Sequence, residues 1–143
     1  MILSIGCDHA GYELKEKIKQ HLSQKGISLT DFGTYSIEST DYPDYAHRVA
    51  NAVSENVSAF GILLCGSANG VCITANKHKG IRAALCWNIE VAQLARQHNN
   101  ANIICIPARF VDESTAFEMV DTFLKTEFEG GRHEKRVSKI DLM

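Results

Sequence analysis

The chain has 143 residues, 45% of them hydrophobic, which is enough apolar surface for the core of one domain without disulfides or a structural metal. Its formal net charge of −2 gives no basic surface for nucleic acid or for an anionic membrane. Because no apolar run approaches the roughly 20 residues of a membrane helix and no cationic leader opens the chain, we expect a single domain, residues 1–143, in a cytoplasmic protein.

The apolar pattern predicts strands and helices in alternation. Apolar residues recur every four positions from Leu14 to Leu22, as on the buried face of a helix, and Gly26 can end that helix. Pro43 suits the first turn of a second helix, and Asn88 and Asp112 can cap two later ones. The predicted strands are residues 2–6, 27–32, 60–64, 81–87 and 103–106, and a short basic helix runs from 132 to about 140.

Strands that alternate with helices at this spacing form βαβ units with right-handed crossovers. We therefore expect an α/β fold, with a parallel sheet of about five strands and helices on both faces. Ligands bind to such a sheet at the carboxyl ends of its strands. Polar side chains gather at these positions: Asp8 and His9 after the first strand, the loop after Cys65, and Arg109 after the fifth strand.

The loop from Gly66 to Gly70 lies between a predicted strand and a predicted helix, so its free N–H groups and the helix N-terminus can bind an anion. Cys65 ends that strand, and a thiol beside a helix N-terminus has a lowered pKa. The loop matches neither the dinucleotide fingerprint nor the P-loop. Taken alone, the pattern also fits a simple turn that follows a buried thiol.

Each of the other candidate residues has two interpretations, one structural and one functional. Asp8 and His9 can be a helix cap with a neighbouring imidazole, or ligands at the binding edge. His98, near a helix C-terminus, can simply balance the helix dipole. Arg132 and Arg136 stand four residues apart, so a helix presents both guanidinium groups on one face, where they suit a phosphate dianion or are merely solvated.

Five cysteines stand at positions 7, 65, 72, 86 and 105, an odd number without a C-x-x-C pair. This spacing argues against a disulfide framework and against a zinc site. Four of the five fall within or at the end of a predicted strand, where a free cysteine behaves as a small buried hydrophobe. We expect most of them to be core thiols.

Five motifs stand in order along nearly the whole chain: CDHAG near the start, TDYPDYA at 40–46, CGSANG followed by ITANK, RQHNNAN at 96–102 and EGGRHEKR at 129–136. Through them the chain resembles the type B ribose-5-phosphate isomerases of the RpiB/LacAB sugar-phosphate isomerase family. The resemblance implies a Rossmann-like three-layer α/β/α sandwich. It also implies a homodimer or dimer of dimers with active sites shared between subunits, a sugar phosphate as the small-molecule partner, and no metal or organic cofactor.

The resemblance also implies roles for individual residues. Cys65 corresponds to the catalytic base, and His98, supplied by the partner subunit, corresponds to the ring-opening acid. As our own hypothesis beside the resemblance, Asp8 assists ring opening together with His98, and Ser67 steadies the reacting oxygens. The implied substrate-binding positions are Asp8, His9, Gly66, Ser67, Ala68, Asn69, Gly70, Asn99, Arg109, Arg132 and Arg136.

The loop departs from the pattern C-G-T-G-[IV]-G of the cysteine-type enzymes at two positions. Ser67 replaces Thr and keeps the hydroxyl, whereas Ala68 replaces Gly and makes a positive φ costlier. The S-x-N-G part is similar to a second branch of the family, in which a Glu just after the loop is the base. Val71 occupies that position here and cannot accept a proton, which leaves Cys65 as the only candidate base in the segment.

The implied reaction interconverts D-ribose 5-phosphate and D-ribulose 5-phosphate, a step of the pentose phosphate pathway. It proceeds by ring opening and by Cys-mediated proton transfer between C2 and C1 through an enediolate. Three alternatives remain open: an isomerase of allose 6-phosphate or galactose 6-phosphate, a non-catalytic sugar-phosphate binding module, and a thiol redox protein. The presence of Cys65 and His98 argues against the second, and the lack of a C-x-x-C pair argues against the third.

Overall fold

A single parallel sheet of five strands forms the centre of the molecule in the computed structural model, which describes residues 1–142. The strands are β1 (Ile2–Cys7), β2 (Ser28–Asp31), β3 (Phe60–Cys65), β4 (Ala83–Leu85) and β5 (Ile103–Pro107), in the spatial order β2-β1-β3-β5-β4. The helices are α1 (Tyr12–Gln24), α2 (Tyr42–Ser54), α3 (Asn69–Ala75), α4 (Ile89–Gln97), α5 (Glu113–Lys125) and α6 (Arg132–Val137). A 3-10 turn, η1 (His9–Gly11), follows β1. The predicted α/β fold is confirmed.

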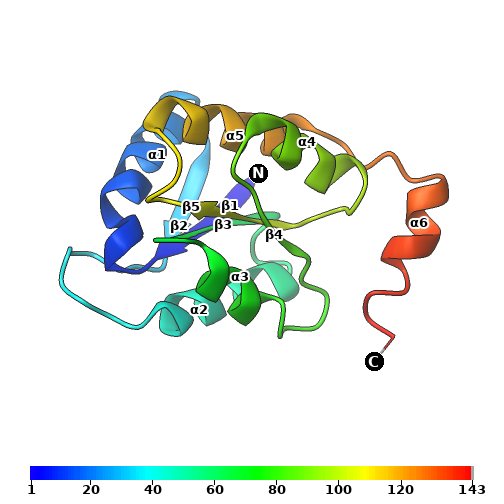
Figure 1. Ribbon diagram of the computed structural model, residues 1–143, viewed down its shortest axis with the longest axis horizontal. Coiled ribbons are helices and arrows are strands. Elements are labelled where there is room, and N and C mark those ends of the chain that lie inside the picture. The colour runs from blue at the N-terminus through cyan, green and yellow to red at the C-terminus, as the bar shows by residue number, and fades with distance from the viewer. Residues whose placement is uncertain (143) are drawn as a thin grey trace.

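Helices cover both faces of the sheet, as Figure 1 shows, with α1, α4 and α5 on one face and α2 and α3 on the other. The chain places β2 on one side of β1 and then crosses to place β3 on the other side. The strand order therefore reverses between β1 and β3. In sheets of this kind, the crevice at such a reversal is the usual ligand site.

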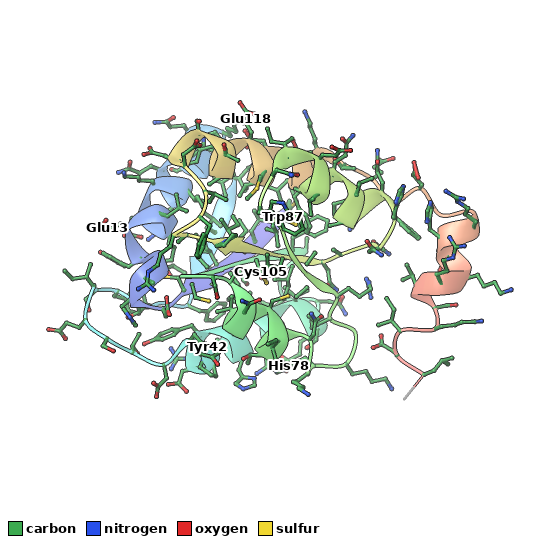
Figure 2. The ribbon with its side chains drawn as sticks, viewed as in Figure 1. Glu13, Tyr42, His78, Trp87, Cys105 and Glu118 are labelled. Atoms are coloured by element: carbon green, nitrogen blue, oxygen red, sulfur yellow. The ribbon has the colours of Figure 1, made fainter. Side chains whose placement is uncertain are left out.

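Side chains of the central strand β3 alternate between the two cores. Ile62 and Leu64 pack with α1, α4 and α5, whereas Leu63 and Cys65 pack with α2 and α3. Cys105 of β5 lies beside Leu63 in the parallel register and is fully buried in the middle of the molecule (Figure 2). The third strand is thus hydrophobic on both faces, as a strand at the centre of a parallel sheet must be.

The helix caps predicted at Asn88 and Asp112, and the glycine predicted to end the first helix, are present in the structure. Asn88 Oδ1 accepts a hydrogen bond from the Val91 N–H at 2.8 Å, and Asp112 Oδ1 accepts one from the Thr115 N–H at 2.7 Å. Gly26, just past α1, has a φ of +73°, a conformation that glycine adopts at little cost. These caps hold the helices that return the chain to the sheet.

Three predicted elements are shorter in the structure. The strand predicted over 27–32 spans Ser28–Asp31. The strand predicted over 81–87 is reduced to Ala83–Leu85; just before it, the Arg82 N–H donates to the side-chain oxygen of Asn102 at 2.8 Å and not to a strand carbonyl. The helix predicted from 132 to about 140 ends at Val137. Beyond it the N–H groups of residues 139 and 140 bond to carbonyls three residues back, as in a tightened final turn.

Helix α6 stands away from the rest of the molecule, at the edge where the strands begin (Figure 1). Only His133 of this helix is buried, and the apolar side chains of Ile140 and Leu142 that follow it are 51% and 73% exposed. Within residues 1–142, no helix is long and apolar enough to cross a membrane.

Candidate active site

A cavity of about 580 Å³ opens at the carboxyl ends of β1, β3 and β5. Seven of the residues singled out in the sequence line it: Asp8, His9, Cys65, Gly66, Ser67, Gly70 and Arg109. They come from three segments far apart in the chain, which the parallel sheet brings to one edge. Its position matches the crevice expected where the strand order reverses.

Cys65 lies where the core meets this cavity. Its side chain packs with the α2 and α3 core and is 5% exposed, yet it lines the cavity. The Cys65 carbonyl accepts a hydrogen bond from the Ala108 N–H at 3.0 Å, which ties the end of β3 to the segment after β5. The thiol is therefore held on rigid backbone beside a space large enough for a small molecule.

The loop after Cys65 is fixed by its own side chains. Ser67 Oγ accepts hydrogen bonds from the backbone N–H and the side-chain amide of Asn69, at 3.3 and 3.2 Å. Ala68 has a φ of +65°, so this alanine takes the left-handed conformation that was expected to be costly, at about 1–2 kcal/mol. Its methyl group is fully buried, which offsets about 0.8 kcal/mol of that cost.

Gly70 is required by a close neighbour from α2. A Cβ at Gly70 would lie only 2.4 Å from the ring of Tyr42, a distance at which one group must move. Tyr42 is the first residue of α2 and also lines the cavity; Figure 2 shows it beside α2 on the lower side of the molecule. The glycine therefore lets the tyrosine ring form one wall of the cavity.

Arg109 places a positive charge over the loop. Its backbone N–H donates to the Gly66 carbonyl at 3.1 Å, and its guanidinium covers Gly66, where an added Cβ would lie 3.0 Å from Nη1. A guanidinium beside free backbone N–H groups attracts an anion. This part of the cavity is accordingly suited to a negatively charged oxygen or phosphate.

Asp8 and His9 are both held by backbone hydrogen bonds. Asp8 Oδ1 accepts hydrogen bonds from the N–H groups of Ala10 and Gly11 at 3.0 and 3.2 Å, so Asp8 caps the turn that follows β1. His9 Nδ1 accepts from the Thr40 N–H at 3.2 Å. Because Nδ1 is the acceptor, the neutral ring carries its proton on Nε2, a donor available to a ligand.

Of the six remaining predicted residues, Ala68 and Asn69 belong to the loop but do not line this cavity, and the other four form a second group at the opposite edge of the sheet. His98, Asn99, Arg132 and Arg136 line a separate cavity of about 470 Å³, between the end of α4 and α6. His98 lies just before the start of β5, and hence at the amino ends of the strands. One chain thus holds the predicted site as two separate halves.

His98 lies against a second histidine that the sequence reasoning missed. The rings of His98 and His133 stack at 4.2 Å between centroids, with 11° between their planes. Tyr42 and Phe110, which line the first cavity, were missed as well. The sequence marks these three residues only by their position next to other candidates. Tyr42 stands in the TDYPDYA motif, Phe110 follows Arg109, and His133 lies between two candidate arginines.

The fold and the cavity together define an α/β protein with a small-anion site at the reversal of a parallel sheet. The model of the Ribose/Galactose Isomerase family matches residues 3–140. The chain belongs to this family.

Solved structures and curated relatives with the same architecture are similar over nearly the whole chain. A ribose 5-phosphate isomerase from Thermotoga maritima is 54% identical, with a TM-score of 0.98, and the match covers 99% of this chain and 98% of the other. Ribose-5-phosphate isomerase B from Mycoplasma genitalium with bound ribulose-5-phosphate is 46% identical, with a TM-score of 0.94 and coverage of 97% and 93%. Ribose-5-phosphate isomerase B from Escherichia coli is 46% identical, covering 96% of this chain and 93% of the relative.

Proposed function

We propose that this protein is a ribose-5-phosphate isomerase of type B, which interconverts D-ribose 5-phosphate and D-ribulose 5-phosphate. One observation carries the proposal: Cys65 lines a cavity built from an N–H-rich loop and an arginine, in a chain 46% identical to the Escherichia coli enzyme. An aldose–ketose isomerase needs a base, donors for an enediolate and a group that opens the sugar ring. The chain offers a residue for each.

Cys65 is the proposed base. Its thiolate removes the proton from C2 of the open-chain sugar and returns it to C1, while the carbonyl and hydroxyl oxygens pass through an enediolate. The N–H groups of the loop from Gly66 to Gly70 stabilise the developing negative charge, and Ser67 steadies the same oxygens. Fixed donors of this kind each contribute about 10²–10³ in rate.

His98 is the proposed ring-opening acid, acting with Asp8. In one chain these residues lie at opposite edges of the sheet, so a second copy must bring its His98 to the cavity that holds Cys65. The exposed apolar side chains of Ile140 and Leu142 beyond α6 support such a contact, because a partner subunit would cover them. We infer a homodimer, or a dimer of dimers, with shared active sites.

The phosphate group is assigned to the arginines. Arg132 and Arg136 project from one helix, and Arg109 and His9 lie in the cavity with Cys65. A guanidinium matches a phosphate with two parallel hydrogen bonds. Asn99 adds a polar contact beside His98. Binding energy from the phosphate then holds the reacting carbons at the base.

The choice of sugar is supported by the relatives, which are named ribose-5-phosphate isomerases, one of them with bound ribulose-5-phosphate. They favour a five-carbon over a six-carbon sugar phosphate. The ring of Tyr42 forms a wall of the cavity and stands so close to Gly70 that not even a methyl group fits between them.

All five cysteines are free thiols, which supports the proposed cytoplasmic location.

A coupled assay with three substrates tests the assignment. Purified protein should convert ribose 5-phosphate with a kcat/KM clearly above those for allose 6-phosphate and galactose 6-phosphate. A preference for either six-carbon substrate would replace the proposed activity with that of a hexose-phosphate isomerase. Binding of all three without turnover would identify a non-catalytic sugar-phosphate module.

A further inference from the structure

Three metal-ligating side chains meet where the end of α4 faces α6. Nε2 of His98 and Nε2 of His133 lie 3.4 and 3.5 Å from the same oxygen of Glu129, Oε1. One ligand atom from each of the three residues lies within 4.8 Å of the other two. We propose that His98, Glu129 and His133 form a binding site for a divalent transition metal such as Zn²⁺, and that metal bound there inhibits the enzyme.

The donor set suits this class of ion. Two imidazoles and one carboxylate are a common set of three protein ligands for Zn²⁺, which leave a fourth position for water or another ligand. Bonds of about 2.0–2.2 Å in tetrahedral geometry place ligand atoms about 3.4 Å apart. The distances from Glu129 to both histidines already meet this requirement.

The backbone of Glu129 and the side chain of His133 are held in place before a metal arrives. The Glu129 N–H donates to the Gln97 carbonyl at 3.1 Å, which ties the segment before α6 to the end of α4. His133 is buried at its side chain, with 11% exposed.

One rearrangement is needed, and His98 can make it. In the stacked pair the rings are nearly parallel, so their nitrogen lone pairs do not yet converge on one point. The His98 side chain is 38% exposed and has room to turn. Metal binding therefore breaks the stack between His98 and His133.

The surrounding charge indicates a reversible site. Arg132 and Arg136 flank His133 on the same helix and oppose a cation. An ion bound here is expected to exchange with solution and not to be a permanent part of the protein. Since we propose His98 as the ring-opening acid, a metal on its Nε2 would remove that acid; this inhibitory effect rests on the proposed function, whereas metal binding itself does not.

Metal binding is measured on the full-length protein after treatment with a chelator. Zn²⁺ is titrated by calorimetry, and Co²⁺ is followed by visible absorption, which reports tetrahedral coordination. We expect one ion per chain, and we expect Glu129→Gln and His133→Asn each to raise Kd about tenfold or more. The matched control is Glu127→Gln, an exposed carboxylate two residues away, which should leave Kd unchanged. Equal Kd values for the wild type and Glu129→Gln would overturn the site.

Inhibition is measured separately, as the ratio of isomerase activity with and without Zn²⁺ in each variant. We expect Zn²⁺ to reduce wild-type activity, EDTA to restore it, and Glu129→Gln to blunt the effect. Undiminished inhibition in Glu129→Gln would assign the effect to a thiol such as Cys65 and refute the inhibitory role. If the protein binds Co²⁺ as expected but isomerises none of the sugars, the metal site stands and the proposed function fails.

Discussion

The ammonium group of Lys15 lies 2.7 Å from both carboxylate oxygens of Asp31, although the Lys15 side chain is completely buried. Its third hydrogen bond goes to the Thr34 carbonyl at 2.8 Å. All three donors of the ammonium are thus satisfied, which is what permits a lysine in the core. The pair fastens α1 to the end of β2, directly before the segment that leads to α2.

Removal of this carboxylate should be severely destabilising. In Asp31→Asn the buried ammonium of Lys15 loses its nearest counter-charge and keeps only Glu16, at 3.8 Å, so we expect the free energy of unfolding to fall by about 3–5 kcal/mol. Urea unfolding followed by circular dichroism measures the loss. The control is Glu113→Gln, which removes an exposed ion pair with Lys17 and should cost no more than about 1 kcal/mol. Similar losses in the two variants would contradict this account.

The same carboxylate should make stability depend on acid pH. Burial of Asp31 works to raise its pKa, but hydrogen bonds from Lys15 and Lys19 outweigh burial and hold the pKa below the usual 3.8. Because the pKa is lower in the folded state, the stabilisation is present above about pH 4 and is lost as the pH falls through the lower folded value. Unfolding free energies measured from pH 6 down to pH 2 should decline more steeply for the wild type than for Asp31→Asn. Parallel curves would mean that Asp31 is not the group responsible.

Replacement of the proposed base should abolish turnover without disturbing the fold. We expect Cys65→Ala to lower kcat for ribose 5-phosphate about a hundredfold or more, because general-base catalysis is worth about 10²–10⁴. Cys72→Ala is the matched control, since Cys72 also packs against the core on the α2 and α3 side but does not line the cavity. Near wild-type turnover by Cys65→Ala would exclude the thiolate mechanism.

A mixing experiment tests whether the site is shared. Cys65→Ala and His98→Asn homodimers should each be nearly inactive. If each site takes Cys65 from one subunit and His98 from the other, half of a randomly reassembled equimolar mixture is mixed dimer with one intact site in two. Recovered activity should therefore approach about a quarter of the wild-type value. A mixture as inactive as its components would place both residues of each site in one chain.

Alkylation rates should distinguish three thiols that lie outside the cavity: Cys72, Cys7 and Cys86. A hydrogen bond from Cys105 lowers the pKa of Cys72, which is only partly buried. Burial raises the pKa of Cys7 and of Cys86 to about 12. Because the thiolate is the reactive form, iodoacetamide at pH 8 should modify Cys72 well before Cys7 or Cys86, as read by peptide mass spectrometry. Equal rates for these three thiols would contradict the assigned environments.

Local patterns predicted most of the architecture. Strand and helix order followed from apolar periodicity, and the caps at Asn88 and Asp112 formed where the side chains allow. The exceptions depend on partners distant in the chain. The strand over 81–87 starts only after Arg82, whose N–H donates to the side chain of Asn102, and no local signal marks an asparagine that will accept such an N–H.

The candidate site was predictable to a different degree in its two halves. Residues that directly follow strands, such as Asp8 and Cys65, must meet at one edge of a parallel sheet, so their proximity follows from the fold class. The positions of Tyr42 and His133 do not follow from it. Tyr42 reaches the cavity only because α2 packs against Gly70, and His133 meets His98 through the path of the segment between α5 and α6.

The detached position of α6 has a consequence for how activity depends on concentration. Under the proposed arrangement a solitary subunit is folded but inactive, since its Arg132, Arg136 and His98 act in the cavity of another subunit. At high dilution, turnover per subunit should vanish while the circular dichroism of the fold persists, and the initial rate should rise with the square of subunit concentration. Encounter between two subunits would then be the first step of catalysis.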